Sequence, residues 1–320
     1  MKVHLFSHES DLDGIISAAI GLIRFPQAEV VFMGYSKENF LTLIEKISIA
    51  NRLMEKSIFI ISDLGLNDSL IQPLRDIFIE ASKKKNDIIW VDHHPWSENG
   101  INEIKRHIEL VFDPSGKKCA SDLMYERFLF GNDIARILAS LAHAMDFFTK
   151  DQYLTPISEL IKYYLSFQDS SSRLFDLSLR ISNGILWDIN MERDYRRYSV
   201  LSNNDKKEVL STMIKKSISS LDVVFVRSSL YLQTSLFSEE IFRITNADLV
   251  IFYDEKGKIS IRRNNEKIAC NEIAAHLFFG GGHKYAAGGC VKKMSTVEDV
   301  IIEIERAIAN IYDNDSKIIK

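Results

Sequence analysis

The first half of the chain alternates short apolar runs with longer amphipathic stretches. The apolar runs have the length and β-branched content of strands, and they cover Lys2–Ser7, Val30–Gly34, Ser57–Ile61 and Asp87–Val91. The stretches between them have helical periodicity, as at 14–25 and 37–54. Strands that alternate with helices in this way predict a mostly parallel sheet with helices on both faces.

The pattern changes twice further along the chain. A loop at 113–116 precedes two predicted helices over 120–130 and 133–147, and the pattern stays helical from about 154 to 216. Strand patterns resume at 221–233 and 247–263, the second with a hairpin turn at Asp254–Gly257. A helix is expected over about 269–278, a glycine loop at 280–282 and a last helix over 297–312. We therefore expect a first α/β domain over 1–195, a helical linker over 196–220 and a smaller α/β domain over 221–320.

Composition and charge narrow the function. The chain has 320 residues, 46% of them hydrophobic, with 40 Lys and Arg against 44 Asp and Glu, a net charge of −4. Such a balance excludes binding of duplex nucleic acid through bulk positive charge, but a local basic cluster can still hold a small nucleotide. Three isolated cysteines argue against a disulfide framework. No apolar run of about 20 residues is present, so a cytoplasmic protein without a membrane partner is expected.

Polar side chains with metal-binding chemistry follow three of the four predicted strands. The segments are SHESDLDG, SDLG and VDHH, which supply His8, Asp11, Asp13, Asp63, Asp92, His93 and His94. Ligands of an open parallel sheet bind beyond the carboxyl ends of its strands, so these side chains are expected to converge. Crowded carboxylates repel unless a cation neutralises them, and mixed Asp and His ligands suit Mn²⁺, Zn²⁺ or Fe²⁺. Helix capping explains a single Asp but not two adjacent histidines.

These segments resemble a known family. SHESDLDG, Asp63, VDHHPW and the later AHAMD are similar to the four motifs of the DHH phosphoesterase superfamily, and FFGGGHKYAAGG resembles the glycine-rich signature of the DHHA1 domain. The two signatures lie at opposite ends of the chain in the expected order. The resemblance implies an α/β fold, with an N-terminal DHH domain whose mostly parallel sheet is flanked by helices and a smaller C-terminal DHHA1 domain.

The resemblance also implies a centre of two Mn²⁺ ions, with Mg²⁺, Co²⁺ or Zn²⁺ as substitutes. One ion would be held by His8, Asp11 and Asp63, and the other by Asp13, Asp63, His93 and Asp146, so that Asp63 bridges the two. Two neighbouring divalent ions can activate a water and clamp the oxygens of a phosphoryl group. The catalytic residues would be His94, facing the scissile phosphate, and Asp92, orienting a neighbouring side chain.

One spacing departs from the family pattern. Only two residues separate His8 from Asp11, where many members have three. RecJ-type nucleases carry an Asp two positions before the paired aspartates, at the place of Glu9 in this chain. Glu9 or His4 is therefore an alternative to His8 or a partner of it. His143, one turn before Asp146, is expected to be a packing or supporting residue.

The second signature implies a substrate-binding region. In DHHA1 proteins the glycine-rich loop and a nearby Arg bind the non-scissile part of a nucleotide, which here means Gly280, Gly281, Gly282, His283 and, in SIRR, Arg262. Glycine lets a phosphate or base approach the backbone, and an Arg guanidinium forms a bidentate fork with phosphate oxygens.

The leading hypothesis is a Mn²⁺-dependent phosphodiesterase, an exonuclease of the nano-RNase kind, that cuts short single-stranded oligonucleotides or dinucleotides to 5′-mononucleotides. Alternatives are a RecJ-like exonuclease on longer DNA or RNA, a phosphodiesterase for c-di-AMP or pApA, and an inactive nucleotide sensor or scaffold. Expected partners are the oligonucleotides themselves, and a homodimer is compatible with the sequence.

Overall fold

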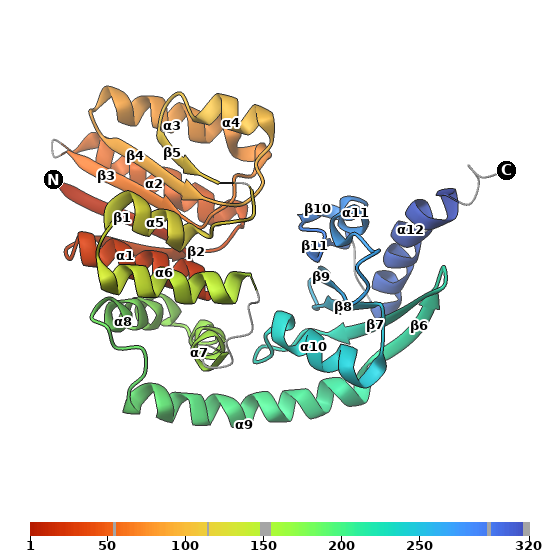
Figure 1. The fold of residues 1–320 in the computed structure, drawn as a ribbon. Coiled ribbons are helices and arrows are strands. Elements are labelled where there is room, and N and C mark those ends of the chain that lie inside the picture. The colour runs from red at the N-terminus through yellow and green to blue at the C-terminus, as the bar shows by residue number, and fades with distance from the viewer. Residues whose placement is uncertain (54–55, 114, 148–154, 293–295, 316–320) are drawn as a thin grey trace. The chain divides into compact units, whose positions relative to one another are not determined.

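The computed structural model describes residues 1–53, 56–113, 115–147, 155–292 and 296–315. The chain forms two compact units, Met1–Tyr195 and Arg196–Lys320, and each has its own sheet (Figure 1). None of the described helices combines the length and the apolar character that crossing a bilayer requires.

The first unit contains a parallel five-stranded sheet in the order β2-β1-β3-β4-β5. Its strands are β1 (Lys2–His8), β2 (Glu29–Met33), β3 (Ser57–Ser62), β4 (Asp87–Asp92) and β5 (Glu109–Phe112). The predicted parallel sheet is confirmed. The sequence reading missed β5, because its four residues, ELVF, are too few and too exposed to produce an apolar run.

Helices cover both faces of this sheet, as the alternation predicts (Figure 1). One face carries α2 (Lys37–Arg52), α3 (Ile71–Lys83) and α4 (Glu98–Ile104). A 3₁₀ turn at Asp68–Leu70 leads directly into α3. The core on this side contains Phe6, Phe59 and Trp90 from the strands and Phe40 and Phe78 from the helices. The other face carries α1 (Leu12–Arg24), α5 (Ala120–Phe128) and α6 (Asp133–Asp146), while α7 (Thr155–Leu165) and α8 (Ser170–Ser182) pack beside α1.

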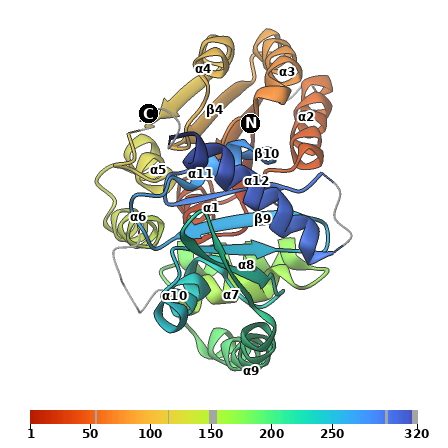
Figure 2. The same ribbon diagram turned by 90° about the vertical axis from the view of Figure 1, so that its right-hand side faces the viewer.

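The second unit contains a six-stranded sheet in the order β10-β11-β9-β8-β7-β6, in which only β7 and β8 pair in parallel. The strands are β6 (Ile214–Ile218), β7 (Leu221–Arg227), β8 (Leu249–Tyr253), β9 (Lys258–Arg263), β10 (Phe278–Gly282) and β11 (Ala286–Cys290). The helices are α9 (Ile189–Thr212), which begins in the first unit, α10 (Thr234–Thr245), α11 (Cys270–Ala275) and α12 (Val297–Asp315). Helix α12 lies across the sheet and buries Val300, Ile304 and Ile308 against it (Figure 2).

Three local predictions for this unit are wrong. The segment 196–220, expected to be helical throughout, ends in β6, and the strand expected over 221–233 ends at Arg227, before α10. The glycine loop at 280–282 is part of β10, paired antiparallel with β11. Glycine has a low strand propensity, so the pattern looked like a loop, but close packing requires it: a Cβ on Gly280 would lie 1.6 Å from the carbonyl oxygen of Ala274.

Candidate metal centre and anion site

The turn from β1 into α1 places the first group of side chains. Asp11 caps α1, with its Oδ1 accepting a hydrogen bond from the Gly14 amide at 3.0 Å. Gly14 is required here, because a Cβ at this position would lie 2.1 Å from the carbonyl oxygen of His8. The tight turn therefore brings Asp11 and Asp13 back beside the end of β1.

His8, Asp11 and Asp63 form a first cluster at this edge of the sheet. The Nδ1 atom of His8 lies 2.7 Å from Asp11 Oδ2 and 3.5 Å from Asp63 Oδ2. His8 Nε2 is 2.9 Å from the Ser10 hydroxyl. Burial opposes a charge on His8, but the carboxylates of Asp11 and Asp63 outweigh it and hold the pKa of His8 well above its usual value.

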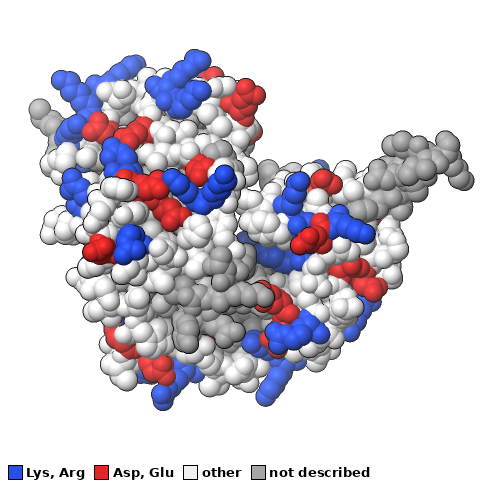
Figure 3. Space-filling model, in the orientation of Figure 1, with Lys and Arg blue, Asp and Glu red and all other residues white. Residues whose placement is uncertain are grey.

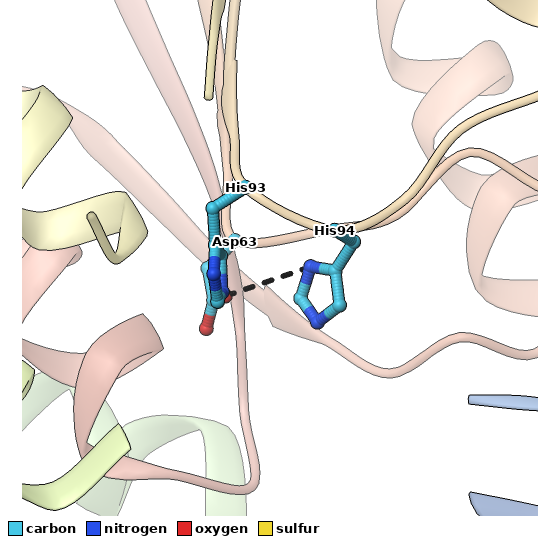
Figure 4. A group of neighbouring side chains, drawn as sticks. All are labelled: Asp63, His93 and His94. Atoms are coloured by element: carbon cyan, nitrogen blue, oxygen red, sulfur yellow. Dashed lines mark ion pairs between the residues drawn. The ribbon is translucent and has the colours of Figure 1, made fainter. Parts of the chain in front are cut away.

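Asp13, His93 and Asp146 form a second cluster, which Asp63 joins to the first. His93 Nε2 lies 3.4 Å from Asp63 Oδ1 and 3.8 Å from Asp13 Oδ2, and its Nδ1 lies 3.8 Å from Asp146 Oδ2. Figure 4 shows Asp63 between His93 and His94, with a dashed line along the 4.0 Å from Asp63 Oδ1 to His94 Nδ1. Asp63 has a φ of 58°, a left-handed conformation that is costly for a non-glycine residue.

The charges of the second cluster are poorly balanced. Burial, followed by repulsion from Asp63 and Asp146, raises the pKa of Asp13 well above its usual value. Burial likewise raises the pKa of Asp146 to about 6. The neighbouring carboxylates overcome the effect of burial on His93 and raise its pKa to about 10. Ionisation of these crowded carboxylates is therefore unfavourable in the folded protein, and a bound cation would relieve their repulsion.

Two buried atoms fit a metal ion directly. His8 Nδ1 and Asp63 Oδ2 lie 3.5 Å apart, and within the described part of the chain neither forms a hydrogen bond, although His8 Nδ1 also pairs with Asp11 Oδ2 at 2.7 Å. A buried polar atom without a partner is unfavourable unless a ligand satisfies it. The donors are imidazole nitrogens and carboxylate oxygens, a set that suits Mn²⁺ and similar divalent ions. The residues present therefore fit a two-ion centre.

His94 is held by hydrogen bonds from two sides. Its Nδ1 lies 2.8 Å from Asp92 Oδ1, and the other oxygen of the fully buried Asp92 accepts a hydrogen bond from Trp96 Nε1 at 2.6 Å. The Tyr35 hydroxyl lies 3.1 Å from His94 Nε2. The His94 side chain is 25% exposed, against 8% for His93, so His94 is the more accessible of the two.

Tyr35 belongs to this group and was missed by the sequence reading. Its hydroxyl also donates to the carbonyl oxygen of Asp63 at 3.4 Å, and its ring packs against His8 with centroids 4.5 Å apart. Burial of the hydroxyl and the nearby carboxylates raise the pKa of Tyr35 well above its usual value, so the phenol keeps its proton. The signal was available, because Tyr35 follows β2 at the same sheet edge as the other residues.

The alternatives to His8 are placed differently. His4 lies four residues before His8 in β1, about 13 Å away along an extended strand. Its Nδ1 is 3.3 Å from Glu29 and its ring stacks on Phe59, so His4 does not reach the cluster. The carboxylate of Glu9 lies beside Gly34, and among the described residues it belongs to none of the candidate metal clusters.

His143 pairs with Asp122 at the start of α5. Its Nδ1 lies 2.6 Å from Asp122 Oδ2, which also accepts a hydrogen bond from the Cys119 amide at the start of α5. Cys119, Asp122 and His143 themselves form a group of candidate ligands. Burial raises the pKa of the Cys119 thiol, so this cysteine has no nucleophilic character in the structure.

Arg262 in the second unit is a partly buried cation for which the described residues provide no counter-ion. Its Nη1 donates to the Ser260 hydroxyl and to the Ile261 carbonyl, both at 2.9 Å. Its Nε is buried and has no hydrogen-bond partner. Among the described residues no carboxylate forms an ion pair with it, and burial lowers its pKa. An anion would satisfy both the charge and the Nε–H group.

One of the predicted glycines, Gly281, shares a face of the sheet with this guanidinium. Ala286 is opposite Arg262, and Gly288 is opposite both Ser260 and Gly281. Directly opposite residues share a face, and residues two apart in a strand do so as well. The resulting glycine strip has only small side chains beside Arg262. Nothing lies within 4 Å of a Cβ built on Gly281, whereas a Cβ on Gly288 would lie 2.6 Å from the carbonyl oxygen of Ile259.

The remaining predicted substrate residues close the hairpin. Gly282 has a φ of 130° and, like Gly280, is packed against backbone, so both are structural as well as small. The His283 amide donates to the Ala286 carbonyl at 2.8 Å. The His283 ring stacks in parallel on Tyr285, with centroids 5.2 Å apart.

The charged surface agrees with the net charge. On the face shown in Figure 3, the described Lys and Arg side chains are interspersed with Asp and Glu.

Comparisons with known proteins identify one domain and the fold. Residues 238–310 match the DHHA1 domain. No curated protein sequence matches the chain. Among solved structures, an exopolyphosphatase-related protein from Bacteroides fragilis is 18% identical, covers 97% of this chain and 92% of its own, and has a TM-score of 0.56. A pGpG-specific phosphodiesterase from Vibrio cholerae is 12% identical, covers 98% of this chain and 100% of its own, and has a TM-score of 0.55. These findings show a DHHA1 domain in the second unit and a fold that is shared with the two solved structures.

Proposed function

We propose that this chain is a metal-dependent phosphodiesterase that hydrolyses short single-stranded oligonucleotides, dinucleotides included, to 5′-mononucleotides. One observation carries the proposal: at the carboxyl ends of parallel strands, Asp63 lies in one cluster with His8 and Asp11 and in another with His93 and His94. His93 in turn belongs to the cluster of Asp13 and Asp146. The DHHA1 match and a phosphodiesterase of similar fold that acts on the dinucleotide pGpG support the same substrate class.

The metal centre would take two ions, with Mn²⁺ preferred. His8, Asp11 and Asp63 would hold one, and Asp13, Asp63, His93 and Asp146 the other. When bound, such a pair supplies an acidified water and positive charge for the phosphoryl oxygens. His4 takes no part in this assignment, because Glu29 and Phe59 hold it elsewhere.

His94 would bind the scissile phosphate. Burial opposes a charge on its ring, but Asp92 outweighs this and raises the pKa of His94, so the imidazolium is favoured. Asp92 fixes the ring through Nδ1 and leaves Nε2 directed at the partly open side, where Tyr35 lies. An Nε2–H group aimed at a phosphate oxygen would stabilise the charge that develops in the transition state.

Arg262 would bind a non-scissile phosphate of the same substrate. The guanidinium has an unsatisfied Nε–H and lies beside the glycine strip, which leaves room for a sugar–phosphate backbone. Arg binds phosphate oxygens through two parallel hydrogen bonds, and this contact requires no particular base. A protein that binds the sugar–phosphate backbone in this way accepts oligonucleotides of many base sequences.

One substrate panel tests the proposal. Purified full-length protein with Mn²⁺ is incubated with RNA and DNA of two to twenty nucleotides, with c-di-AMP, pApA and pGpG, and with pyrophosphate. We expect cleavage of the linear dinucleotides and short oligomers to mononucleotides. The variant Asp63→Asn should be inactive, and Asp176→Asn, at an exposed position on α8, is the matched control. Preference for twenty-nucleotide strands indicates the RecJ-like alternative, and binding without cleavage of any substrate indicates a sensor.

A further inference from the structure

We propose that Phe279 is a stacking surface for a nucleobase of the bound oligonucleotide. The proposal rests on the proposed function and adds to it a base-binding residue in the second unit. It would explain a side chain whose placement is unfavourable for the protein alone.

Phe279 is unfavourable in two independent ways. Its side chain is among the most exposed of the large apolar residues, with 79% of the residue accessible to solvent. Its backbone has a φ of 53°, a left-handed conformation that glycine adopts easily and a phenylalanine adopts at a cost. Strain of this kind is characteristic of residues that contact ligands.

The position of Phe279 connects it to the anion site. It lies in the edge strand β10, where the pairing with β11 is irregular between Phe278 and Gly281. Two residues further on, Gly281 begins the strip that continues through Gly288 towards Ser260 and Arg262. A nucleotide whose phosphate binds Arg262 would therefore lie along a strip that has Phe279 near its outer end.

One side of the ring is already supported. The centroids of the Phe278 and Phe279 rings are 3.9 Å apart, while most of the Phe279 surface is open to solvent. A ring held from one side and open on the other is the arrangement on which bases stack in single-strand binding proteins. Stacking uses the π face that every base has, so it requires no particular sequence and agrees with backbone recognition by Arg262.

Binding of two small phosphates to the full chain tests this inference apart from catalysis. Isothermal titration calorimetry compares 5′-AMP with ribose 5-phosphate, which has the same sugar and phosphate but no base. In the wild-type protein we expect 5′-AMP to bind about 5- to 150-fold more tightly, the range typical of one base on one aromatic ring. In Phe279→Leu and Phe279→Gly this preference should fall towards one, with the affinity for ribose 5-phosphate unchanged.

Stability separates stacking from a structural role. Phe279→Gly removes the strained conformation, so its unfolding midpoint should equal or exceed that of the wild-type protein although binding is lost. The matched control is Phe130→Leu, at a phenylalanine of the first unit that is 81% exposed, and it should keep the preference for 5′-AMP. A lowered midpoint for Phe279→Gly would mean that the ring supports the fold, and the inference would be wrong.

The other outcomes are equally decisive. If the wild-type protein binds the two phosphates equally, or if both Phe279 variants keep the preference for 5′-AMP, Phe279 does not stack on a base. Equal losses for both ligands would assign Phe279 to a contact within the protein. Failure of the proposed function looks different, because the wild-type protein would then cleave none of the oligonucleotides whatever the calorimetry shows.

Discussion

Replacing Asp146 by Asn is expected to stabilise the metal-free protein at neutral pH. Asp146 is 30% exposed and shares its site with Asp13 and Asp63, and its Oδ2 lies 3.8 Å from His93 Nδ1. Burial raises its pKa from 3.8 to about 6, although the charge of His93 works in the opposite direction. The folded protein therefore binds a proton at Asp146 more tightly than the unfolded chain does.

The sign and size follow from this difference. A carboxyl group whose pKa is raised in the folded state contributes its full stabilisation below about pH 4, the pKa of the unfolded chain. This contribution to the free energy of unfolding is lost as the pH rises through about 6. A rise of about 2 pKa units is equivalent to about 3 kcal/mol at most, since one unit is about 1.4 kcal/mol. For a domain of this size, 1 kcal/mol shifts the unfolding midpoint by about 2–4 °C. Asp146→Asn should thus raise the midpoint at pH 7.5 by up to about 6–12 °C.

Tryptophan fluorescence reports unfolding of the first unit, because Trp90 and Trp96 are buried beside the strand end that carries the site. Chelator-treated wild-type, Asp146→Asn and Asp176→Asn proteins are heated at pH 4 and pH 7.5. We expect Asp146→Asn to unfold at a higher temperature than the wild-type protein at pH 7.5 and at nearly the same temperature at pH 4. Added Mn²⁺ should stabilise the wild-type protein more than this variant. An increase in the unfolding midpoint of the same size at both pH values, or no increase at pH 7.5, would refute the reasoning.

Four further substitutions test the other parts of the site. Asp63→Asn should abolish turnover and lower the metal content of both positions, whereas His94→Gln should lower turnover and leave the metal content unchanged, as measured by elemental analysis. Tyr35→Phe removes the hydrogen bond to His94 Nε2, and a loss of turnover by about 3- to 10-fold with unchanged metal content is expected. Arg262→Ala should slow cleavage of dinucleotides by about 10- to 150-fold, the size of a lost charge-assisted contact. Hydrolysis of bis-p-nitrophenyl phosphate, which has no second phosphate, should then change much less; equal losses on both substrates would contradict the role of Arg262.

The sheet edge was predictable because parallel strands share a direction. Once β1, β3 and β4 were recognised from their apolar runs, His8, Asp63 and His93 had to meet beyond the same edge. Tyr35 follows β2 at the same edge, but the sequence pattern did not predict it as a site residue, because a tyrosine is more readily interpreted as a packing residue than as a catalytic one. Its role depends on a distance to His94, 59 residues away, which no local pattern records.

The structure of the glycine-rich segment, in contrast, could not be predicted from the sequence. Local propensity predicts a loop at 280–282, but these residues belong to a strand that is formed by pairing with β11 and by the approach of Gly280 to Ala274. Such contacts depend on the packing of the folded chain, and they override intrinsic preference. Phe279 has its positive φ within the same irregular pairing, so the residue behind the base-stacking proposal could be found only from the structure.

Two aspartates of the proposed metal centre also stabilise the fold, because they accept hydrogen bonds from helix amides. Substitutions of these residues therefore change stability as well as metal binding. Asp11 caps α1, and both oxygens of Asp13 accept hydrogen bonds at 2.8 Å from the amides of Ala120 and Ser121 at the start of α5. Removing either carboxylate leaves helix amides without acceptors, at a cost of about 0.5–2 kcal/mol for each cap. Asp63 and Asp146 accept no such amide bonds among the described hydrogen bonds, since Asp63 Oδ2 has no partner and Asp146 faces His93. Loss of activity in an Asp11 or Asp13 variant therefore combines unfolding with loss of metal, whereas Asp63 and Asp146 report on the metal centre itself.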